Sequence, residues 1–264
     1  MADTVGHKTA IPRDKFGRPL IMPPDGGKPS AYQRCTTFID VLSDRYQLEA
    51  WKQRQVAVGL SLRPDLVLRA GSTKDKATLD KVCEAALEAA GSSAAATTGT
   101  ALHELTERID RGEAVTVPDA WRADIAAYQV ATAFLGKRDI EVFVVNDALR
   151  VGGTFDRVLV IDGRAYVADL KTGSIDYDAA KITMQLAVYA NSRRYDPETG
   201  ERSDLGVNIE RGIIIHLPAG AGRCTLYWAD LNTGWDGVNL AAEVREWRRT
   251  KAVLQPIDPA SLVS

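Results

Sequence analysis

Two apolar runs separated by an Asp-Gly pair mark residues 151–173, VGGTFDRVLVIDGRAYVADLKTG, as a β-hairpin. Residues 154–161 and 164–171 are rich in Val, Leu, Ile, Tyr and Phe. Asp162-Gly163 between them is the strongest short-range signal for a two-residue turn. Because such a turn fixes the register of its strands, the sequence predicts which side chains face each other.

Counting outward from the turn gives each residue of the first strand a partner on the second. The expected pairs are Ile161 with Arg164, Val160 with Ala165, Val158 with Val167, Asp156 with Asp169, and Thr154 with Lys171. Side chains alternate between the faces of a strand, so Asp156, Asp169 and Lys171 share one face with the valines. The opposite face carries Phe155, Leu159, Ile161, Tyr166, Ala168 and Leu170. Both faces are therefore expected to be buried.

Two aspartates that face each other between apolar neighbours are destabilising unless a cation or a shared proton lies between them. A divalent metal ion held by both carboxylates is the simpler solution. The plainer alternative is that one aspartate is solvated at a strand end while the other pairs with Lys171. A bulge at the turn would change the pairing, although alternation keeps Asp169 and Lys171 together.

The composition is that of an ordinary globular protein, with 264 residues, 45% hydrophobic, 26% charged and a net charge of −2. No apolar run reaches the roughly 18 residues of a membrane-spanning helix, and the N-terminal stretch lacks a signal-peptide core. We therefore expect a cytoplasmic protein. The small negative charge counts against a protein that coats nucleic acid, but it is compatible with a local basic groove. Three scattered cysteines favour reduced thiols over a disulfide framework or a four-cysteine metal site.

Helical patterns surround the hairpin. Residues 1–34 are rich in Pro, Gly and charge and are expected to form an irregular arm. The periodicity predicts helices that start near Thr36 or Thr37 and then cover 46–59, 75–90, a stretch from Thr97 or Thr98 to Arg111, 119–136, Asp176 or Asp178 to Arg194, and 234–253. Further strands are expected at 139–146, 209–217 and 223–230.

Several polar residues of these elements are candidates for the same site. His103 and Glu107 are four apart on one helix face, and imidazole is a common ligand of divalent cations. Glu141 begins a strand and is a further acidic candidate, with a solvated strand-end residue as the alternative. On the helix after the hairpin, Lys181, Gln185 and Tyr189 form one row, and Gln185 needs hydrogen-bond partners if it is buried.

Basic residues gather in two regions, which are either solvated faces or phosphate-binding walls. The first precedes residue 77 and includes Lys52, Arg54, Arg63, Arg69, Lys74 and Lys76. The second is at the last helix and includes Arg245, Arg248, Arg249 and Lys251.

Four motifs in order, GTALH, GTFDR, ADLKTG and QLAVY, resemble those of the PD-(D/E)XK nuclease superfamily, in particular its RecB-like branch with phage recombination exonucleases. The resemblance covers roughly residues 36 to 190, and residues 36–54 also resemble the helical lead-in of phage-encoded members. It implies an α/β fold: a central mixed β-sheet flanked by helices, a restriction-endonuclease-like core, with a helical N-terminal region. Residues 35–264 would form one nuclease domain, divided into a helical lead-in (35–95), a catalytic core (96–230) and a C-terminal helix (231–264).

The resemblance also implies roles for individual residues. His103, Asp156, Asp169 and the Leu170 carbonyl would hold Mg²⁺ or Mn²⁺, and Lys171 would be the catalytic lysine. Gln185 and Tyr189 match the helix motif that lines the site in this branch. Thr172 and Lys181 are candidates for contact with DNA. Some branch members bind an iron–sulfur cluster through four cysteines, so three scattered cysteines predict that no such cluster is present here.

The function implied by the resemblance is metal-dependent hydrolysis of DNA, with exonuclease action in phage recombination as the first choice. DNA is the expected partner, and a single-strand annealing protein is a further candidate partner inside the bacterial host cell. A structure-specific or CRISPR-spacer-trimming endonuclease on the same fold is one alternative. A non-catalytic DNA-binding protein that has kept the fold is the other.

Overall fold

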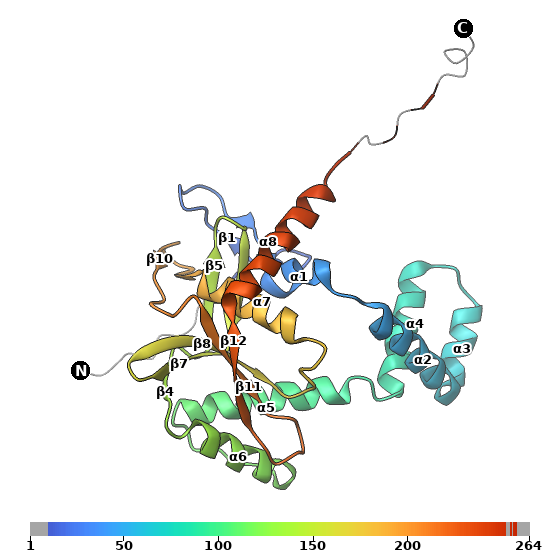
Figure 1. Ribbon diagram of the computed structural model, residues 1–264. Helices are drawn as coiled ribbons and strands as arrows, with labels where there is room; N and C mark the ends of the chain where they lie inside the picture. Colours follow the sequence, from blue (N-terminus) through green and yellow to red (C-terminus); the bar gives the residue numbers. More distant parts are fainter. Residues whose placement is uncertain (1–9, 252–253, 255, 258–264) are drawn as a thin grey trace.

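The computed structural model describes residues 10–251, 254, 256 and 257. The protein has the predicted α/β fold, with mixed β-sheets flanked by helices (Figure 1). The helices are α1 (Cys35–Ile39), α2 (Tyr46–Leu62), α3 (Pro64–Gly71), α4 (Lys76–Ala89), α5 (Ala94–Asp110), α6 (Arg122–Thr132), α7 (Ala179–Ala190) and α8 (Leu231–Trp247), with 3₁₀ turns η1 (Asp40–Leu42) and η2 (Asp119–Trp121). Among the described residues, no helix is long and apolar enough to span a membrane.

The strands form two five-stranded sheets and a short ribbon. The first sheet has the order β10 (Arg202–Ser203), β9 (Arg193–Tyr195), β5 (Val142–Asn146), β6 (Val151–Phe155) and β3 (Gln33–Arg34). The second has the order β12 (Thr225–Asp230), β11 (Arg211–His216), β8 (Arg164–Lys171), β7 (Arg157–Ile161) and β4 (Gly136–Arg138). The ribbon pairs β1 (Leu20–Ile21) with β2 (Ser30–Ala31). Both sheets are mixed, because β3 runs parallel to β6 and β11 runs parallel to β8.

The turn at Asp162-Gly163 sets the predicted register for the hairpin of β7 and β8. Both turn residues have positive φ, 49° and 76°, as a type I′ turn requires. The ladder then pairs Ile161 with Arg164, Val160 with Ala165, and Val158 with Val167, all as predicted.

Beyond Arg157 the predicted hairpin is wrong, because the chain bends at Asp156 and leaves the sheet. β6 belongs to the other sheet, where Thr154 pairs with Phe143 instead of Lys171. The bend also reverses the side on which Phe155 lies. It was expected beside Leu159, but it packs with Val158 and Val167 in the core beneath α7 and α8. The single strand expected over 154–161 is therefore divided between two sheets.

Two apolar cores cover the faces of the second sheet. The larger one joins the inner sides of α1, α7 and α8 to Val158 and Val167 of the hairpin. The other packs Tyr128 of α6 and Leu135 against Leu159 and Leu170. Helices on both faces thus bury the hairpin, as the apolar residues on both of its faces predicted.

Helices α2, α3 and α4 form a separate helical lobe, which stands out from the sheets in Figure 1. Its own small core contains Leu66, Val82 and Ala86. α3 was not predicted; Pro64 in its first turn and an apolar row including Leu66 are the signals that the pattern offered. The lobe is joined to the rest of the chain before α2 and again at the start of α5.

The N-terminal arm is more ordered than predicted. Within residues 10–34, three short strands form, and β3 extends the first sheet. Ile21 and Tyr32 are fully buried in a core shared with Val145 and Tyr195. The Tyr32 hydroxyl donates to Asp147 at 2.8 Å. This buried packing is what turns a Pro- and Gly-rich segment into part of the fold.

Several predicted boundaries are wrong by a few residues. α5 begins at Ala94, three residues before Thr97, and the Thr97 hydroxyl donates to the Ser93 carbonyl from within the helix. α7 ends at Ala190, where Arg193–Tyr195 becomes strand β9. α8 begins directly after Asp230, which caps it, and ends at Trp247. Residues 252–253 of the predicted last helix, and most of the chain beyond them, lie outside the described residues.

Candidate active site

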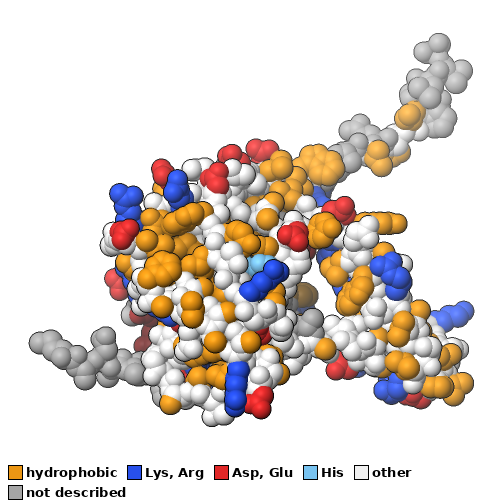
Figure 2. All heavy atoms as spheres, turned by 60° about the horizontal axis from the view of Figure 1, so that its bottom comes forward, with side chains coloured by type: hydrophobic (Ala, Val, Ile, Leu, Met, Phe, Trp, Pro, Cys, Tyr) orange, Lys and Arg blue, Asp and Glu red, His pale blue; other side chains and the backbone are white. Residues whose placement is uncertain are grey.

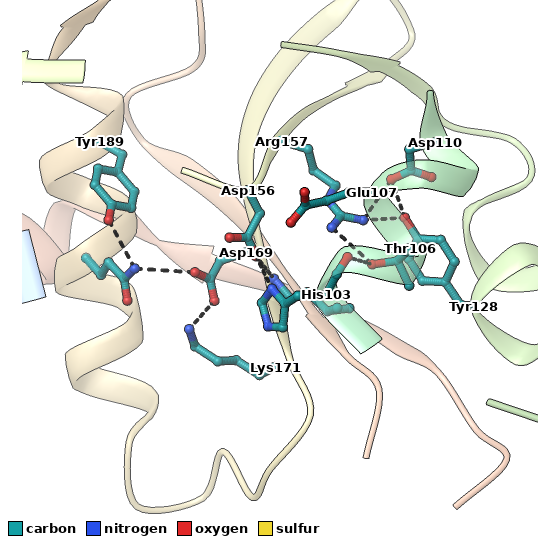
Figure 3. A network of polar contacts seen from close by, with 12 residues as sticks. His103, Thr106, Glu107, Asp110, Tyr128, Asp156, Arg157, Asp169, Lys171 and Tyr189 are labelled. Atoms are coloured by element: carbon teal, nitrogen blue, oxygen red, sulfur yellow. Dashed lines mark hydrogen bonds and ion pairs between the residues drawn. The ribbon is translucent and has the colours of Figure 1, made fainter. Parts of the chain in front are cut away.

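Four elements bring the predicted polar residues together (Figure 3). Asp156 lies in the bend between β6 and β7, and Asp169 and Lys171 lie at the end of β8. His103 comes from α5, and Tyr189 comes from α7. The bend matters because it turns the Asp156 carboxylate toward the last residues of β8, although the two strands no longer pair there.

Asp169 is the buried centre of this group. It is 3% exposed, and its Oδ2 lies 2.5 Å from the Lys171 ammonium. Its Oδ1 is 3.4 Å from the Gln185 amide nitrogen, which is also 3.2 Å from the Tyr189 hydroxyl. Gln185, in the predicted row on α7, therefore has the hydrogen-bond partners that a buried amide requires. One of these partners is Asp169, a candidate catalytic residue.

Asp156 makes the second half of the site. Its Oδ2 accepts a hydrogen bond from the Leu170 backbone N–H at 2.7 Å and lies 3.4 Å from His103 Nδ1. The N–H and C=O of one strand residue point to the same side, so the Leu170 carbonyl is also directed toward Asp156. Asp156, His103 and this carbonyl thus lie on the side of β8 where the ladder with β7 has ended.

Burial and the proximity of two carboxylates shift the pKa values of groups in the site. Burial, with the Asp156 charge as the second cause, raises the pKa of Asp169 to about 7, although Lys171 opposes the shift. Burial also lowers the pKa of His103, against the attraction of Asp156. His103 is therefore neutral near pH 7 and has a lone pair to offer a metal ion.

The donor set fits a hard divalent cation in its chemistry. Its two carboxylates and backbone carbonyl suit Mg²⁺ or Mn²⁺, and the neutral imidazole favours a transition-type ion such as Mn²⁺. Asp169 Oδ2 is buried and receives no hydrogen bond of normal geometry, although Lys171 lies beside it. A cation at this atom would satisfy it. In the described part of the chain, no three His, Cys, Asp or Glu side chains already converge in metal-binding geometry.

A buried ionic network behind the site was missed by the sequence analysis. Arg157, next to Asp156, is fully buried and its Nη1 lies 2.7 Å from Asp110 Oδ2, while its Nη2 donates to Thr106 at 3.3 Å. The Tyr128 hydroxyl donates to the same Asp110 oxygen at 2.5 Å and contacts Arg157. The network ties α5, which carries His103, to β7. The signal was present in GTFDR, since an arginine in an apolar strand needs a buried partner.

The remaining candidates lie in different places. The Glu107 side chain is half-buried on α5, and Figure 3 places it beside Asp156 and Arg157, so the structure brings it to the site. Glu141 does not join the site: its backbone N–H donates to the Asp156 carbonyl at 2.8 Å, but its side chain lines a separate cavity of about 820 Å³. Lys181 is held by Asp40 at 2.6 Å. Thr172 directly follows Lys171, and its hydroxyl faces Gly99 of α5.

Two glycines of the motifs allow close approach of these elements. A Cβ on Gly153 would lie 2.9 Å from the Tyr189 ring, so this glycine leaves space for the α7 row. A Cβ on Gly99 would lie 2.9 Å from the Thr172 hydroxyl. The glycine of GTALH thus lets α5 approach the end of β8, one turn before His103.

The basic residues do not form one continuous wall on the face that Figure 2 shows. There the helical lobe is separated from the body by a gap, and positive and negative side chains alternate on it. Some lobe residues pair locally, such as Arg63 with Asp65 at 2.7 Å. In the last helix, Arg245 donates to the carbonyls of Thr37 and Phe38 and so binds α8 to α1. Arg245 is therefore partly buried against α1 and is not a fully solvated residue.

The cysteines are free thiols in three separate environments: Cys35 is buried, Cys83 is exposed and Cys224 is half-buried. Burial raises the pKa of Cys35 to about 12 and that of Cys224 to about 11, so neither is a reactive thiolate near neutral pH.

Comparison with known proteins adds little to this geometry. No family model matches the chain, and no curated protein matches it. The crystal structure of SSO0001 is similar over 51% of this chain and 63% of that chain, with 15% sequence identity and a TM-score of 0.27. The match spans less than two thirds of that chain, and a likeness this slight carries no argument.

Proposed function

We propose that this protein is a metal-dependent deoxyribonuclease of the RecB-like branch of the PD-(D/E)XK superfamily, acting as an exonuclease. The observation that carries the proposal is the convergence of Asp156, Asp169, Lys171 and His103 from three separate elements. The four motifs that resemble the family thus meet at one place in the fold. The proposed setting is phage recombination or repair in the cytoplasm of a bacterial host.

In this mechanism Asp156, Asp169, His103 and the Leu170 carbonyl would hold Mg²⁺ or Mn²⁺. When bound, such an ion would polarise the scissile phosphate and lower the pKa of its water. Lys171 lies beside Asp169 and is placed to orient the attacking water or to stabilise the negative charge that develops on the phosphate. Gln185 holds the Asp169 carboxylate through Oδ1 and leaves Oδ2 for the ion.

The buried network supports this arrangement from behind. Arg157 is held between Thr106 and Asp110, which lie about one and two turns beyond His103 on α5. The imidazole is thereby kept near Asp156. Because the network is buried, its geometry is protected from competition by water.

The chemistry of the site does not explain why the enzyme would require a free DNA end, as an exonuclease does. A metal site acts on a phosphate wherever it lies along a strand. A requirement for a free end must come from how the helical lobe and the body enclose DNA. The test therefore compares linear duplex with covalently closed circles of the same sequence, with Mg²⁺, Mn²⁺ or EDTA.

We expect linear duplex to be degraded with either metal ion, while closed circles stay intact and EDTA stops the reaction. Asp169→Ala is the matched control for contaminating nucleases. Nicking or linearisation of circles that is lost in Asp169→Ala would instead establish the endonuclease alternative. No cleavage of either substrate with any divalent ion would favour the non-catalytic DNA-binding alternative.

A further inference from the structure

Strand β12 is an unprotected edge of the second sheet. Exposed strand edges pair with other chains, and proteins usually prevent this with short strands, Lys, Pro or bulges. The other terminal strands of the described sheets follow that rule: β3 and β10 have two residues each and β4 has three, and all contain arginine. β12 has six residues, TLYWAD, with no Lys, Arg or Pro. Its pairing with β11 runs unbroken from Asp230 to Thr225, so it has no bulge.

The side chains at this edge are apolar and accessible. Tyr227 is 44% exposed and Trp228 is 53% exposed, on opposite faces of the sheet. A hollow of about 360 Å³ lies beside Tyr227 and is lined by Ile175 and Met184. A second hollow of about 480 Å³ lies beside Trp228. Room for large side chains of a partner therefore exists on both faces of the edge.

The sequence of β12 is complementary to itself. When two copies of a strand pair antiparallel about a two-fold axis, a register centred on one residue places that residue opposite its own copy. A register centred on Tyr227 pairs Leu226 with Trp228 and Thr225 with Ala229. The two side chains of each pair then lie on the same face of the joined sheet. A register centred on Trp228 would instead oppose Leu226 to Asp230.

In the Tyr227-centred register Asp230 of one copy faces Cys224 of the other, and Arg223 is the residue next to that position. Opposite charges therefore lie near each other at both ends of the paired strands, one residue out of register. We propose that the protein forms a two-fold homodimer through β12, which joins the second sheets of both copies into one continuous sheet of ten strands. This inference is independent of the proposed nuclease activity.

Such a dimer has a defined consequence for the two candidate active sites. The two β8 strands would be separated by five strand spacings, or about 24 Å. Because the copies run antiparallel, their carboxyl ends, which carry Asp169 and Lys171, would point in opposite directions. The two sites would therefore open away from each other.

Sedimentation velocity of the full chain, without metal, tests the proposal. We expect a dimer in the micromolar range. Tyr227→Lys and Tyr227→Glu each place like charges directly opposite each other, so each should weaken the dimer by about tenfold or more. An equal mixture of the two variants should restore dimers, because Lys then faces Glu. Trp247→Lys is the matched control: this more exposed aromatic on α8 should leave association unchanged.

A cross-link gives a second measurement that does not depend on weakening the interface. With Cys83 and Cys224 replaced by alanine, Tyr227→Cys should form an intermolecular disulfide under mild oxidation, and Trp247→Cys should not. Circular dichroism of each variant confirms that it is folded. A monomeric wild type throughout the micromolar range would overturn the proposal. So would dimers that persist in both charged variants, or a mixture that fails to associate.

Discussion

The Asp156 carboxylate takes the place of a missing strand partner, because its Oδ2 accepts the Leu170 backbone N–H at 2.7 Å. The ladder between β7 and β8 ends at Arg157 and Ala168, so this N–H would otherwise lack a partner in the hairpin. The bond fixes the carboxylate on the segment that also carries Asp169 and Lys171. It also makes Asp156→Asn a clean test, since an amide oxygen can accept the same bond while the charge is lost.

Divalent metal should stabilise the folded protein. Binding to the native state alone raises the melting temperature by mass action, so millimolar Mg²⁺ or Mn²⁺ should raise it measurably. Asp156→Asn should keep the fold but show a much smaller rise. Differential scanning fluorimetry with and without EDTA measures both. An unchanged wild-type melting curve at millimolar metal would contradict the proposed site.

The metal-free protein should lose stability as the pH rises toward 8. The folded pKa of Asp169, about 7, lies above its unfolded value of about 4, so the folded state binds more protons between these values. The free energy of unfolding therefore falls as pH rises through this window. Asp169→Asn removes the titration and should be more stable than the wild type at pH 8, by about 1–3 kcal/mol.

Urea unfolding in EDTA at pH 5, 6, 7 and 8 measures this difference. The advantage of Asp169→Asn should shrink steadily toward pH 5, where the wild-type carboxyl is already protonated. Metal should reverse the trend, because its binding requires the ionised carboxylate. An advantage that is the same at every pH would mean that the variant acts through packing and not through charge.

Lys171→Ala should remove most of the cleavage and leave metal binding largely intact. An ammonium group is not a metal ligand, whereas loss of one group that stabilises transition-state charge typically slows a reaction by roughly 10²–10³-fold. Single-turnover cleavage and the metal-induced rise in melting temperature separate the two effects. Lys28→Ala is the control, since this exposed lysine lies between β1 and β2 and belongs to no candidate site. Near-normal turnover in Lys171→Ala would exclude the catalytic role.

The buried pair of Arg157 and Asp110 should show strong coupling. Asp110→Asn leaves the buried Arg157 guanidinium without its carboxylate and should cost about 3–5 kcal/mol of the free energy of unfolding. Arg157→Met should cost less, because Lys137 still lies 2.8 Å from Asp110. The double variant should cost less than the sum, because it leaves neither charge behind. Urea denaturation of the four proteins measures the coupling. Strictly additive losses would show that the two residues act independently.

The turn and first pairs of the hairpin, and the closeness of Asp169 and Lys171, could be predicted because they depend on local rules. The Asp-Gly turn fixed the pairing of Val158 with Val167, and alternation placed Asp169 and Lys171 on one side. The helical spacing of Gln185 and Tyr189 correctly predicted that they meet, at 3.2 Å. These signals act within a few residues and do not depend on the rest of the chain.

The bend at Asp156 could not be predicted in the same way, since it depends on which sheet each half of the strand joins. Thr154 pairs with Phe143 because β5 is adjacent in space, and no pattern within 154–161 reveals this. Likewise, the partner that buries Arg157 is 47 residues away in the sequence, at Asp110. The short strands of the arm depend on burial of Ile21 and Tyr32 by distant strands.

Helix α5 joins the helical lobe to the body and is held in place near its C-terminal end. It leaves the helical lobe at Ala94 and is anchored to β7 through Thr106 and Asp110 (Figure 1). At 1.5 Å per residue, the lobe end lies about 18 Å from Thr106, whereas His103 lies only about 4.5 Å from it. A swing of the lobe about that anchor displaces His103 by about a quarter of the lobe's own movement. Any movement of the lobe about that anchor would therefore change the distance between His103 and Asp156 by at most about a quarter as much.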